Sequence, residues 1–188
     1  ASTHWVESRQ DGASLSAEFK GSGFDLYWTA TEGGGTFEIL VDGESVQTVN
    51  TQGALETKRT SVDQLNQSNK HTVVITQKTG SVVLQGIDVK RLVDGETYRA
   101  AVHSCCNSGG AAIDFARIDE KIFSSALQLI NPTHVIVQLG TNDAIEGFEE
   151  TEFRAYMNTI AQRIKTALPH VNLLINSCND IKGSEWDE

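Results

Sequence analysis

The sequence predicts two structural halves, an antiparallel β-sandwich over residues 1–92 and an α/β segment with parallel strands over residues 93–188. Two observations support this division. Residues 15–89 contain short runs in which apolar and polar side chains alternate, as in strands with one buried face. After Arg91, strand-like and helix-like patterns alternate along the chain, as in parallel sheets whose strands are joined by helices. The boundary falls near residues 92–95.

Length and composition argue against a nucleic-acid-binding protein and against a membrane protein. The chain has 188 residues, which is enough for one domain or two small ones at ~100–200 residues each. The formal charge of -10 at pH 7 repels phosphate backbones and anionic headgroups, so we expect no nucleic-acid partner and no membrane partner. No apolar run approaches the ~18–20 residues of a membrane span. The first five residues lack a basic start followed by an apolar stretch, so we expect no export signal in this segment.

The chain has three cysteines, Cys105, Cys106 and Cys178. An odd number with one adjacent pair does not form a disulfide framework, and the spacing does not match a zinc site. We therefore expect free thiols, which leave the cellular compartment open.

The first half reads as short strands separated by tight turns. Residues 24–28 and 37–41 alternate between apolar and polar side chains, and residues 71–76 and 81–84 are rich in β-branched residues. Asp42-Gly43 between two of these runs predicts a type I′ hairpin turn, because both central residues of that turn need positive φ. These runs predict an antiparallel sandwich.

The second half reads as alternating strands and helices. The predicted elements are a strand over 98–102, a helix over 111–130, a strand over 135–139, a helix over 152–168 and a strand over 171–175. Asn131-Pro132 ends the first helix, because the residue before a proline avoids the helical region. Short links between these elements predict parallel strands with right-handed crossovers.

Ligands of open parallel sheets bind beyond the carboxyl ends of the strands. The loops at those ends span residues 104–110, 140–147 and 176–183. Glycines before a helix, as in Asn107-Ser108-Gly109-Gly110, let a ligand approach outward-pointing amides. That sequence is equally typical of a plain helix-entry loop. Gly140-Thr141-Asn142-Asp143, taken alone, favours a strand-ending turn in which Asn and Asp bond their own backbone.

In combination, the glycine loop, the helix, Asn-Pro, the buried strand and Gly-Thr-Asn-Asp resemble blocks II and III of the SGNH (GDSL-type) hydrolases. The resemblance covers residues 102–143 and continues to residue 175. It implies a flavodoxin-like three-layer fold, present here in part, and no metal or organic cofactor. It also implies an oxyanion hole built from the Gly110 backbone amide and the Asn142 side-chain amide. Asp143 would brace the loop without reacting. Such donors suit ester chemistry, which puts negative charge on a carbonyl oxygen.

The chain departs from the family pattern at the nucleophile and the base. It contains no Gly-Asp-Ser and no Asp-x-x-His. Ser104 follows a predicted strand but lies too close to Gly110 to form a separate block, so we expect an ordinary loop serine. We expect structural or surface roles for the five histidines, which are His4, His71, His103, His134 and His170.

The strand order 2-1-3-4-5 of such folds places the nucleophile strand between the two strands that this chain supplies. We therefore expect residues 1–188 to be a piece of a larger polypeptide. Another segment or chain would supply the central strand and the Ser/Asp/His triad, and the β half would be an insertion.

The β half is similar to galactose-binding-like jelly-rolls. The resemblance rests on residues 19–26, 37–43, 70–75 and 86–89. These modules accompany carbohydrate esterases, including O-antigen deacetylases of phage tailspikes. The resemblance implies a polysaccharide or acetylated glycan as substrate and an extracellular or virion location, and a tailspike origin would imply a homotrimer. Trp5, Tyr27 and Trp28 either stack on sugar rings or serve packing, with Trp28 in the core and Trp5 at a domain junction.

Two functional hypotheses remain at this stage. The first is a serine esterase that removes O-acetyl groups from a polysaccharide, with its triad outside this chain. The second is a non-catalytic carbohydrate-binding or adhesion protein whose α/β half is a degenerate scaffold.

Overall fold

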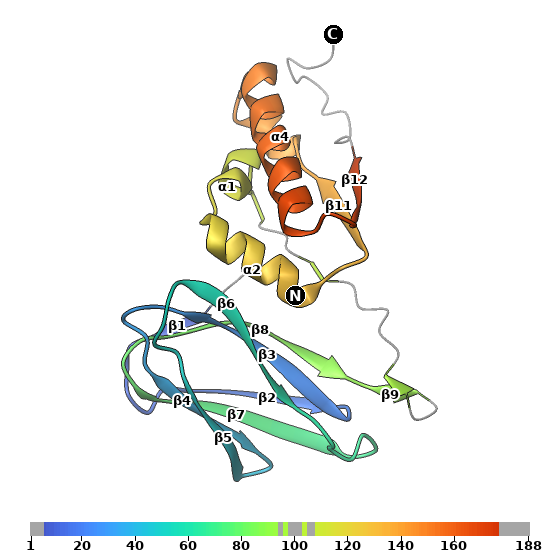
Figure 1. Ribbon diagram of the computed structural model, residues 1–188. Coiled ribbons are helices and arrows are strands. Elements are labelled where there is room, and N and C mark those ends of the chain that lie inside the picture. Colours follow the sequence, from blue (N-terminus) through green and yellow to red (C-terminus); the bar gives the residue numbers. More distant parts are fainter. Residues whose placement is uncertain (1–5, 94–95, 98–102, 105–107, 177–188) are drawn as a thin grey trace. The chain divides into compact units, whose positions relative to one another are not determined.

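The computed structural model describes residues 6–93, 96–97, 103–104 and 108–176 (Figure 1). The chain divides into two compact units, a first unit Ala1–Cys105 and a second unit Cys106–Glu188. The domain boundary expected at 92/93 stays a prediction. Several features that the sequence singled out lie outside the described residues: Trp5, His4, the predicted strand over 98–102, the three cysteines, Asn107 and residues 177–183 of the third loop.

The first unit is a jelly-roll-like sandwich of two four-stranded antiparallel sheets, ordered β1-β8-β3-β6 and β2-β7-β4-β5 (Figure 1). Its strands are β1 Val6–Ser8, β2 Ser14–Lys20, β3 Gly23–Ala30, β4 Thr36–Val41, β5 Glu44–Asn50, β6 Glu56–Val62, β7 Lys70–Thr79 and β8 Val82–Lys90. A short hairpin follows, β9 Leu92–Val93 with β10 Glu96–Thr97. The sandwich that the alternating runs predict is therefore present.

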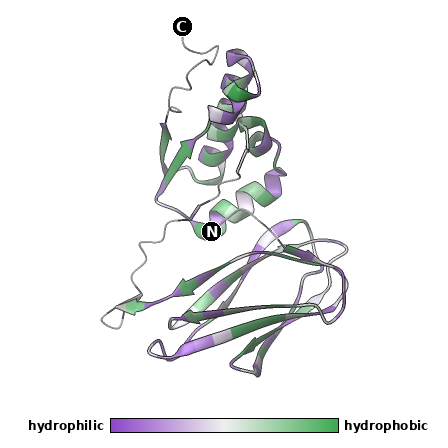
Figure 2. Cartoon of the chain, turned by 180° about the vertical axis from the view of Figure 1, so that it is seen from behind, coloured by the Kyte–Doolittle hydropathy of each residue, from purple (hydrophilic) through white to green (hydrophobic). Residues whose placement is uncertain are grey.

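The core of this unit lies between the two sheets. Phe24 from one sheet and Phe37 from the other are fully buried. In Figure 2 the strands of both sheets carry green stretches that are interrupted by purple ones. Trp28 packs edge-on against Phe37, and its indole N–H donates to the Thr60 hydroxyl at 3.0 Å. Trp28 is therefore a core residue. Tyr27 is also buried, so neither ring offers a face to a sugar.

The turn at Asp42-Gly43 has φ values of 53° and 89°, which are the positive values that a type I′ turn requires. The Asp42 carboxylate accepts from the Thr72 amide at 2.8 Å and lies 2.7 Å from Nδ1 of His71. Nε2 of His71 faces the Asn66 carbonyl at 2.9 Å. Both ring nitrogens face acceptors, which favours the protonated ring, and the bond to Asp42 raises the pKa of His71. The expectation of a structural role is confirmed for this histidine.

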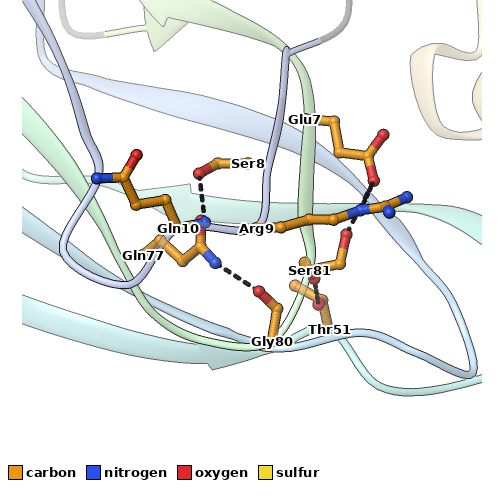
Figure 3. Close-up of polar contacts among 8 residues, drawn as sticks. All are labelled: Glu7, Ser8, Arg9, Gln10, Thr51, Gln77, Gly80 and Ser81. Carbon is orange, nitrogen blue, oxygen red and sulfur yellow. Dashed lines mark hydrogen bonds and ion pairs between the residues drawn. The ribbon is translucent and has the colours of Figure 1, made fainter.

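Polar contacts close one end of the sandwich, where β1 meets the turn between β7 and β8 (Figure 3). The Glu7 carboxylate accepts from Arg9 at 2.8 Å and from the Ser81 hydroxyl at 3.1 Å. Both bonds lower the pKa of Glu7. The buried Gln77 side chain donates to the Gly80 carbonyl. The bond between Ser81 and Glu7 ties β1 to the start of β8.

The outer face of the first sheet carries a buried ionic network. Asp25 is 1% exposed and accepts from Lys90 and from the Ser61 hydroxyl, each at 2.6 Å. Burial opposes ionisation, but the bonds from Lys90 and Ser61 outweigh it and lower the pKa of Asp25. Burial, followed by the charge of Asp88, raises the pKa of Tyr27 to about 12. The network is satisfied within the sheet, so we assign it to stability.

The second unit contains α1 Ala112–Ala116, α2 Glu120–Ile130, β11 His134–Gln138, α3 Thr141–Ile145, α4 Glu150–Ala167 and β12 Asn172–Asn176. β11 and β12 are parallel and in register, from His134 opposite Asn172 to Gln138 opposite Asn176. Parallel strands joined by a helix are what the sequence predicts.

Two local expectations for this unit were wrong. A single helix over 111–130 is instead two helices, because Asp119 takes an extended conformation and its carboxylate caps the amides of Lys121 and Ile122. The stretch after β11, expected as a loop, forms the short helix α3. The predicted end at Asn131-Pro132 is confirmed, since Asn131 adopts the left-handed conformation at φ 47°.

The helices of the second unit pack on one face of its sheet. The buried core consists mainly of α4 residues, with Ala112 of α1, and Phe123 of α2 packs against it. Val135 and Val137 of β11 face the same core. The described residues thus form one helical layer on two parallel strands, which is less than the expected flavodoxin-like three layers. In this part of the chain, no helix is long and apolar enough to span a membrane.

Candidate active site

Two loops of the second unit meet at the carboxyl end of β11. The Asn142 side-chain amide donates to the Gly110 carbonyl at 2.9 Å. Gly110 is buried and Asn142 is half-buried. The structure therefore places the two predicted site residues side by side, although they are 32 positions apart in sequence.

Asp143 joins the same two loops through the backbone. Its side chain is fully buried, and its two carboxylate oxygens accept the Ala112 amide at 2.9 and 3.1 Å. Ala112 comes two residues after Gly110, and Asp143 directly follows Asn142. The bond therefore fixes the position of one loop against the other. The carboxylate is used in this bracing contact, as expected for Asp143.

The local conformations follow from a few residues. Gly140 has φ 123° at the start of α3, a value that side-chain-bearing residues rarely adopt, so glycine is required where the chain turns from β11 into α3. At the start of α1, the Asp114 carboxylate accepts the Ala111 amide at 3.0 Å, and the Asp114 amide donates to the Ala111 carbonyl at 3.1 Å. The sequence interpretation missed Asp114. An acidic residue three positions after a helix cap was the available signal.

Arg163 of α4 holds the other end of α1. Its guanidinium donates to the Ala116 carbonyl at 2.9 Å and to the Ile118 carbonyl at 2.6 Å, and it lies 4.6 Å from the centre of the Phe123 ring. These bonds satisfy carbonyls that a helix end leaves without partners. Both ends of α1 are therefore held by side chains, and the glycine loop that precedes α1 is anchored through this helix.

The described histidines of the second unit are far from this meeting point. His134 begins β11 and His170 precedes β12, so both lie at the amino ends of the parallel strands. Asn142 lies beyond the carboxyl end, and a five-residue strand spans roughly 16 Å. Neither histidine is placed to act as a catalytic base for a reaction beside Asn142.

The remaining candidates from the sequence belong to the first unit. His103 lies with its Nδ1 3.5 Å from the Asp88 carboxylate, and Ser104 beside it is exposed. The structure gives neither residue a geometric relation to the Gly110–Asn142 pair.

Comparison with known proteins gives only weak similarities. No family model and no curated protein matches the chain. Among solved structures, a family two carbohydrate esterase from Clostridium thermocellum in complex with cellohexaose has 15% identity and a TM-score of 0.38, covering 91% of this chain and 72% of its own. A family two carbohydrate esterase from Cellvibrio japonicus has 14% identity and a TM-score of 0.38, covering 95% and 73%.

A family 35 carbohydrate binding module from an environmental isolate matches part of the chain, with 12% identity and a TM-score of 0.37, covering 50% of this chain and 75% of its own. All three TM-scores are below 0.5. Similarity at this level carries no argument for an activity or a ligand, which must be inferred from the residues of this chain.

Proposed function

We propose that this chain supplies the oxyanion hole of an SGNH-type serine esterase that removes O-acetyl groups from a polysaccharide. The observation that carries the proposal is the bond from the Asn142 side chain to the Gly110 carbonyl. It brings together two residues whose types and order resemble the oxyanion blocks of that family.

The asparagine side chain suits this role because its amide nitrogen has two N–H groups. The bond to Gly110 uses one of them and fixes the plane of the amide. We assign the second N–H to the substrate oxygen. The backbone N–H of Gly110 is the other donor, and glycine leaves room for the substrate because it has no side chain.

In the proposed reaction, a serine hydroxyl attacks the acetyl carbonyl, and a histidine removes its proton. The carbonyl oxygen becomes an oxyanion that the two N–H donors stabilise. As this intermediate collapses, the protonated histidine gives its proton to the leaving oxygen, so that the sugar hydroxyl is released and an acetyl-enzyme remains. Water, deprotonated by the same histidine, then attacks the acetyl-enzyme and releases acetate and the free serine. The serine, the histidine and its aspartate come from a segment outside residues 1–188.

The finer features belong to the same proposal. They are a flavodoxin-like sheet completed by the outside segment, an acetylated glycan as substrate, and an extracellular or virion location. A phage tailspike would add a trimeric assembly. The sandwich would shape the cleft or bind the glycan.

The test uses the full-length product of the encoding gene and p-nitrophenyl acetate. Asn142→Ala should lower kcat by about 10²–10³-fold, because an oxyanion donor acts in the transition state. KM should change little, since the ground state gains little from this donor. Asn158→Ala, at an exposed position of α4, is the matched control and should leave both constants unchanged. Residues 1–188 alone should turn over substrate near the background rate.

Full activity in the Asn142→Ala protein would remove the basis of the proposal. A full-length protein that binds an acetylated polysaccharide without hydrolysing it, and binds equally well after Asn142→Ala, would instead establish the non-catalytic binding protein.

A further inference from the structure

The sandwich of the first unit has an apolar opening on the side where β1 and β2 form the edges of the two sheets. The opening leads into a cavity of about 160 Å³ whose walls come from both sheets. Val6 of β1 and Leu15 of β2 lie on these walls and are 48% and 47% exposed, while Leu26 and Leu84 deeper in the walls are buried. We call this opening the edge cavity. Apolar surface that stays in contact with water forgoes the stabilisation that burial gives, so a piece of protein that covered the edge cavity would stabilise the unit.

The edge cavity begins where the pairing of β1 with β8 ends. β1 pairs only with the first three residues of β8, and this pairing stops with Val6 opposite Leu84. β8 continues to Lys90 and pairs with β3 on its other side along most of its length. In the described part of the first unit, no strand pairs with residues 85–90 on the β1 side. Such an edge presents N–H and C=O groups that another strand can use.

The register of β1 identifies the segment that continues along this edge. In an antiparallel pair, each step back from Val6 along one strand is a step forward from Leu84 along the other. The residues that precede Val6 are Ser2-Thr3-His4-Trp5, which lie outside the described residues. Their types suit a strand, since threonine and tryptophan are enriched in strands and the segment contains no proline. Continuation of the register brings this segment along residues 85–88, and the cavity walls include residues 85–87.

A glycine of β8 indicates that another group approaches the outer face of this sheet. Gly86 lies opposite Tyr27 of β3 and therefore on the outer side of the sheet, away from the core of the sandwich. Its φ is not positive, and a Cβ placed on it would meet no neighbouring atom of the described residues within 4 Å. Neither the backbone nor a described neighbour requires glycine at this position. Glycine inside a strand often marks the close approach of another group.

Trp5 is the residue of the segment that can fill this space. Val6 faces the edge cavity, and side chains alternate along a strand, so Trp5 faces the outer side of the sheet. Gln85 is the extra residue of a bulge in β8, and two residues of a bulge oppose one residue of a neighbouring strand, so Trp5 comes beside Gly86. The Gln85 amide donates to the Thr29 hydroxyl at 2.9 Å, so this side chain lies toward β3. An aromatic ring beside a strand glycine stabilises strand pairing.

We propose that residues 2–5 continue β1 along the free edge of β8, so that their main chain covers the edge cavity and the Trp5 ring lies over Gly86. Trp5 is then a packing residue of the first unit, and neither a platform for a sugar ring nor a contact at a domain junction. Gly110 and Asn142 take no part, so a failure of the proposed function would leave this strand in place.

Amide hydrogen exchange of residues 1–188 tests the added strand. Among residues 85–87, the amides that point away from β3 should exchange on the order of 100-fold more slowly than in Thr3→Pro/His4→Pro, because two successive prolines remove a ladder bond and release the strand. Thr3→Ala/His4→Ala is the matched control, since it keeps both backbone N–H groups, and it should retain the protection. The amide of Ile39, in the other sheet, reports whether the unit is folded in each variant.

A second experiment tests the contact between Trp5 and Gly86. In the parent chain, Gly86→Val should lower the midpoint of thermal unfolding of the first unit, because the valine takes the place of the indole. In the Trp5→Ala background the same change should raise the midpoint, since valine favours strands and no described group fills the space. Unfolding is followed through the fluorescence of Trp28, which is buried in the core of this unit.

Four results would overturn the proposal. Equal exchange of the 85–87 amides in the parent and in the proline variant, with Ile39 protected in both, would show that no strand lies along this edge. If the proline variant does not fold, exchange of these amides in the parent at the rate of an unstructured chain would show the same. Protection that grows with protein concentration would identify a second copy of the chain as the occupant. The same effect of Gly86→Val in both backgrounds would show that Trp5 lies elsewhere.

Discussion

The two units of this chain bury their apolar residues to different degrees. In the first unit, two sheets cover each other, and large side chains such as Phe24, Phe37 and Ile39 are fully buried. In the second unit, the most deeply buried residues are the small Ala112 and the polar Asp143, while Ile136 is mostly exposed on the sheet. The first unit completes its core with its own strands. In the second, the described helices bury one face of the two-stranded sheet.

The largest expected difference follows from removing one apolar side chain from each unit. Phe37→Ala should destabilise the first unit by about 3–5 kcal/mol, because it leaves a cavity between the sheets. Ile136→Ala in residues 1–188 should change stability by about 0.5 kcal/mol or less, since the side chain is exposed. Urea unfolding measures the first loss through the fluorescence of Trp28, which packs against Phe37. Unfolding of the second unit is followed by helical circular dichroism. A large cost of Ile136→Ala would show that the Ile136 side chain is covered in residues 1–188.

A smaller effect tests the polar bracing of the second unit. Asp143→Ala should cost about 1–3 kcal/mol, because it leaves the buried Ala112 amide without its acceptor. Asp143→Asn should cost less, since an amide oxygen remains. Asp119→Ala removes another carboxylate that accepts backbone amides, but at an exposed helix cap, and should cost about 1 kcal/mol.

The matching readout is hydrogen exchange of the Ala112 amide. It should accelerate in Asp143→Ala and stay unchanged in Asp119→Ala. Equal exchange in both variants would mean that Asp143 does not hold the glycine loop.

The smallest effect is a pH dependence confined to the first unit. The bond to Asp42, followed by the Asn66 carbonyl, raises the pKa of His71, so its contribution is complete at acid pH and is lost as pH rises through that raised pKa. The bond to His71, followed by the Thr72 amide, lowers the pKa of Asp42. The Asp42 contribution is therefore lost as pH falls through its lowered pKa. The pair stabilises the unit most between these two values.

Thermal unfolding across this range tests the pair. His71→Gln should remove the loss of stability on the alkaline side, while His170→Gln, at an exposed position of the second unit, should not. If His71→Gln lost thermal stability at alkaline pH as the unchanged protein does, the His71 imidazole would not be the group responsible for that loss.

How far the sequence predicts the structure differs between the units for a physical reason. Alternation around Phe24 and Phe37 predicted buried strands, and Asp42-Gly43 predicted the turn, because these signals are local. The break at Asp119 was missed because a continuous apolar spacing concealed a capping residue. The bond between Asn142 and Gly110 depends on tertiary folding, and only the resemblance to a family pointed to that pair. The apolar runs over 135–139 and 171–175 indicate strands buried on both faces. This expectation is wrong for the described residues, because the helices cover only one face and leave Ile136 and Leu174 66% and 55% exposed.

The central claim is that Gly110 and Asn142 stabilise an oxyanion next to a nucleophile from outside this chain. The most direct measurement is a crystal structure of the full-length gene product after reaction with an alkyl phosphonate, which labels an activated serine. The account predicts a labelled serine outside residues 1–188 with a phosphonyl oxygen about 2.7–3.1 Å from both the Gly110 amide nitrogen and Asn142 Nδ2. A label on Ser104, or a phosphonyl oxygen bound by other groups, would contradict it.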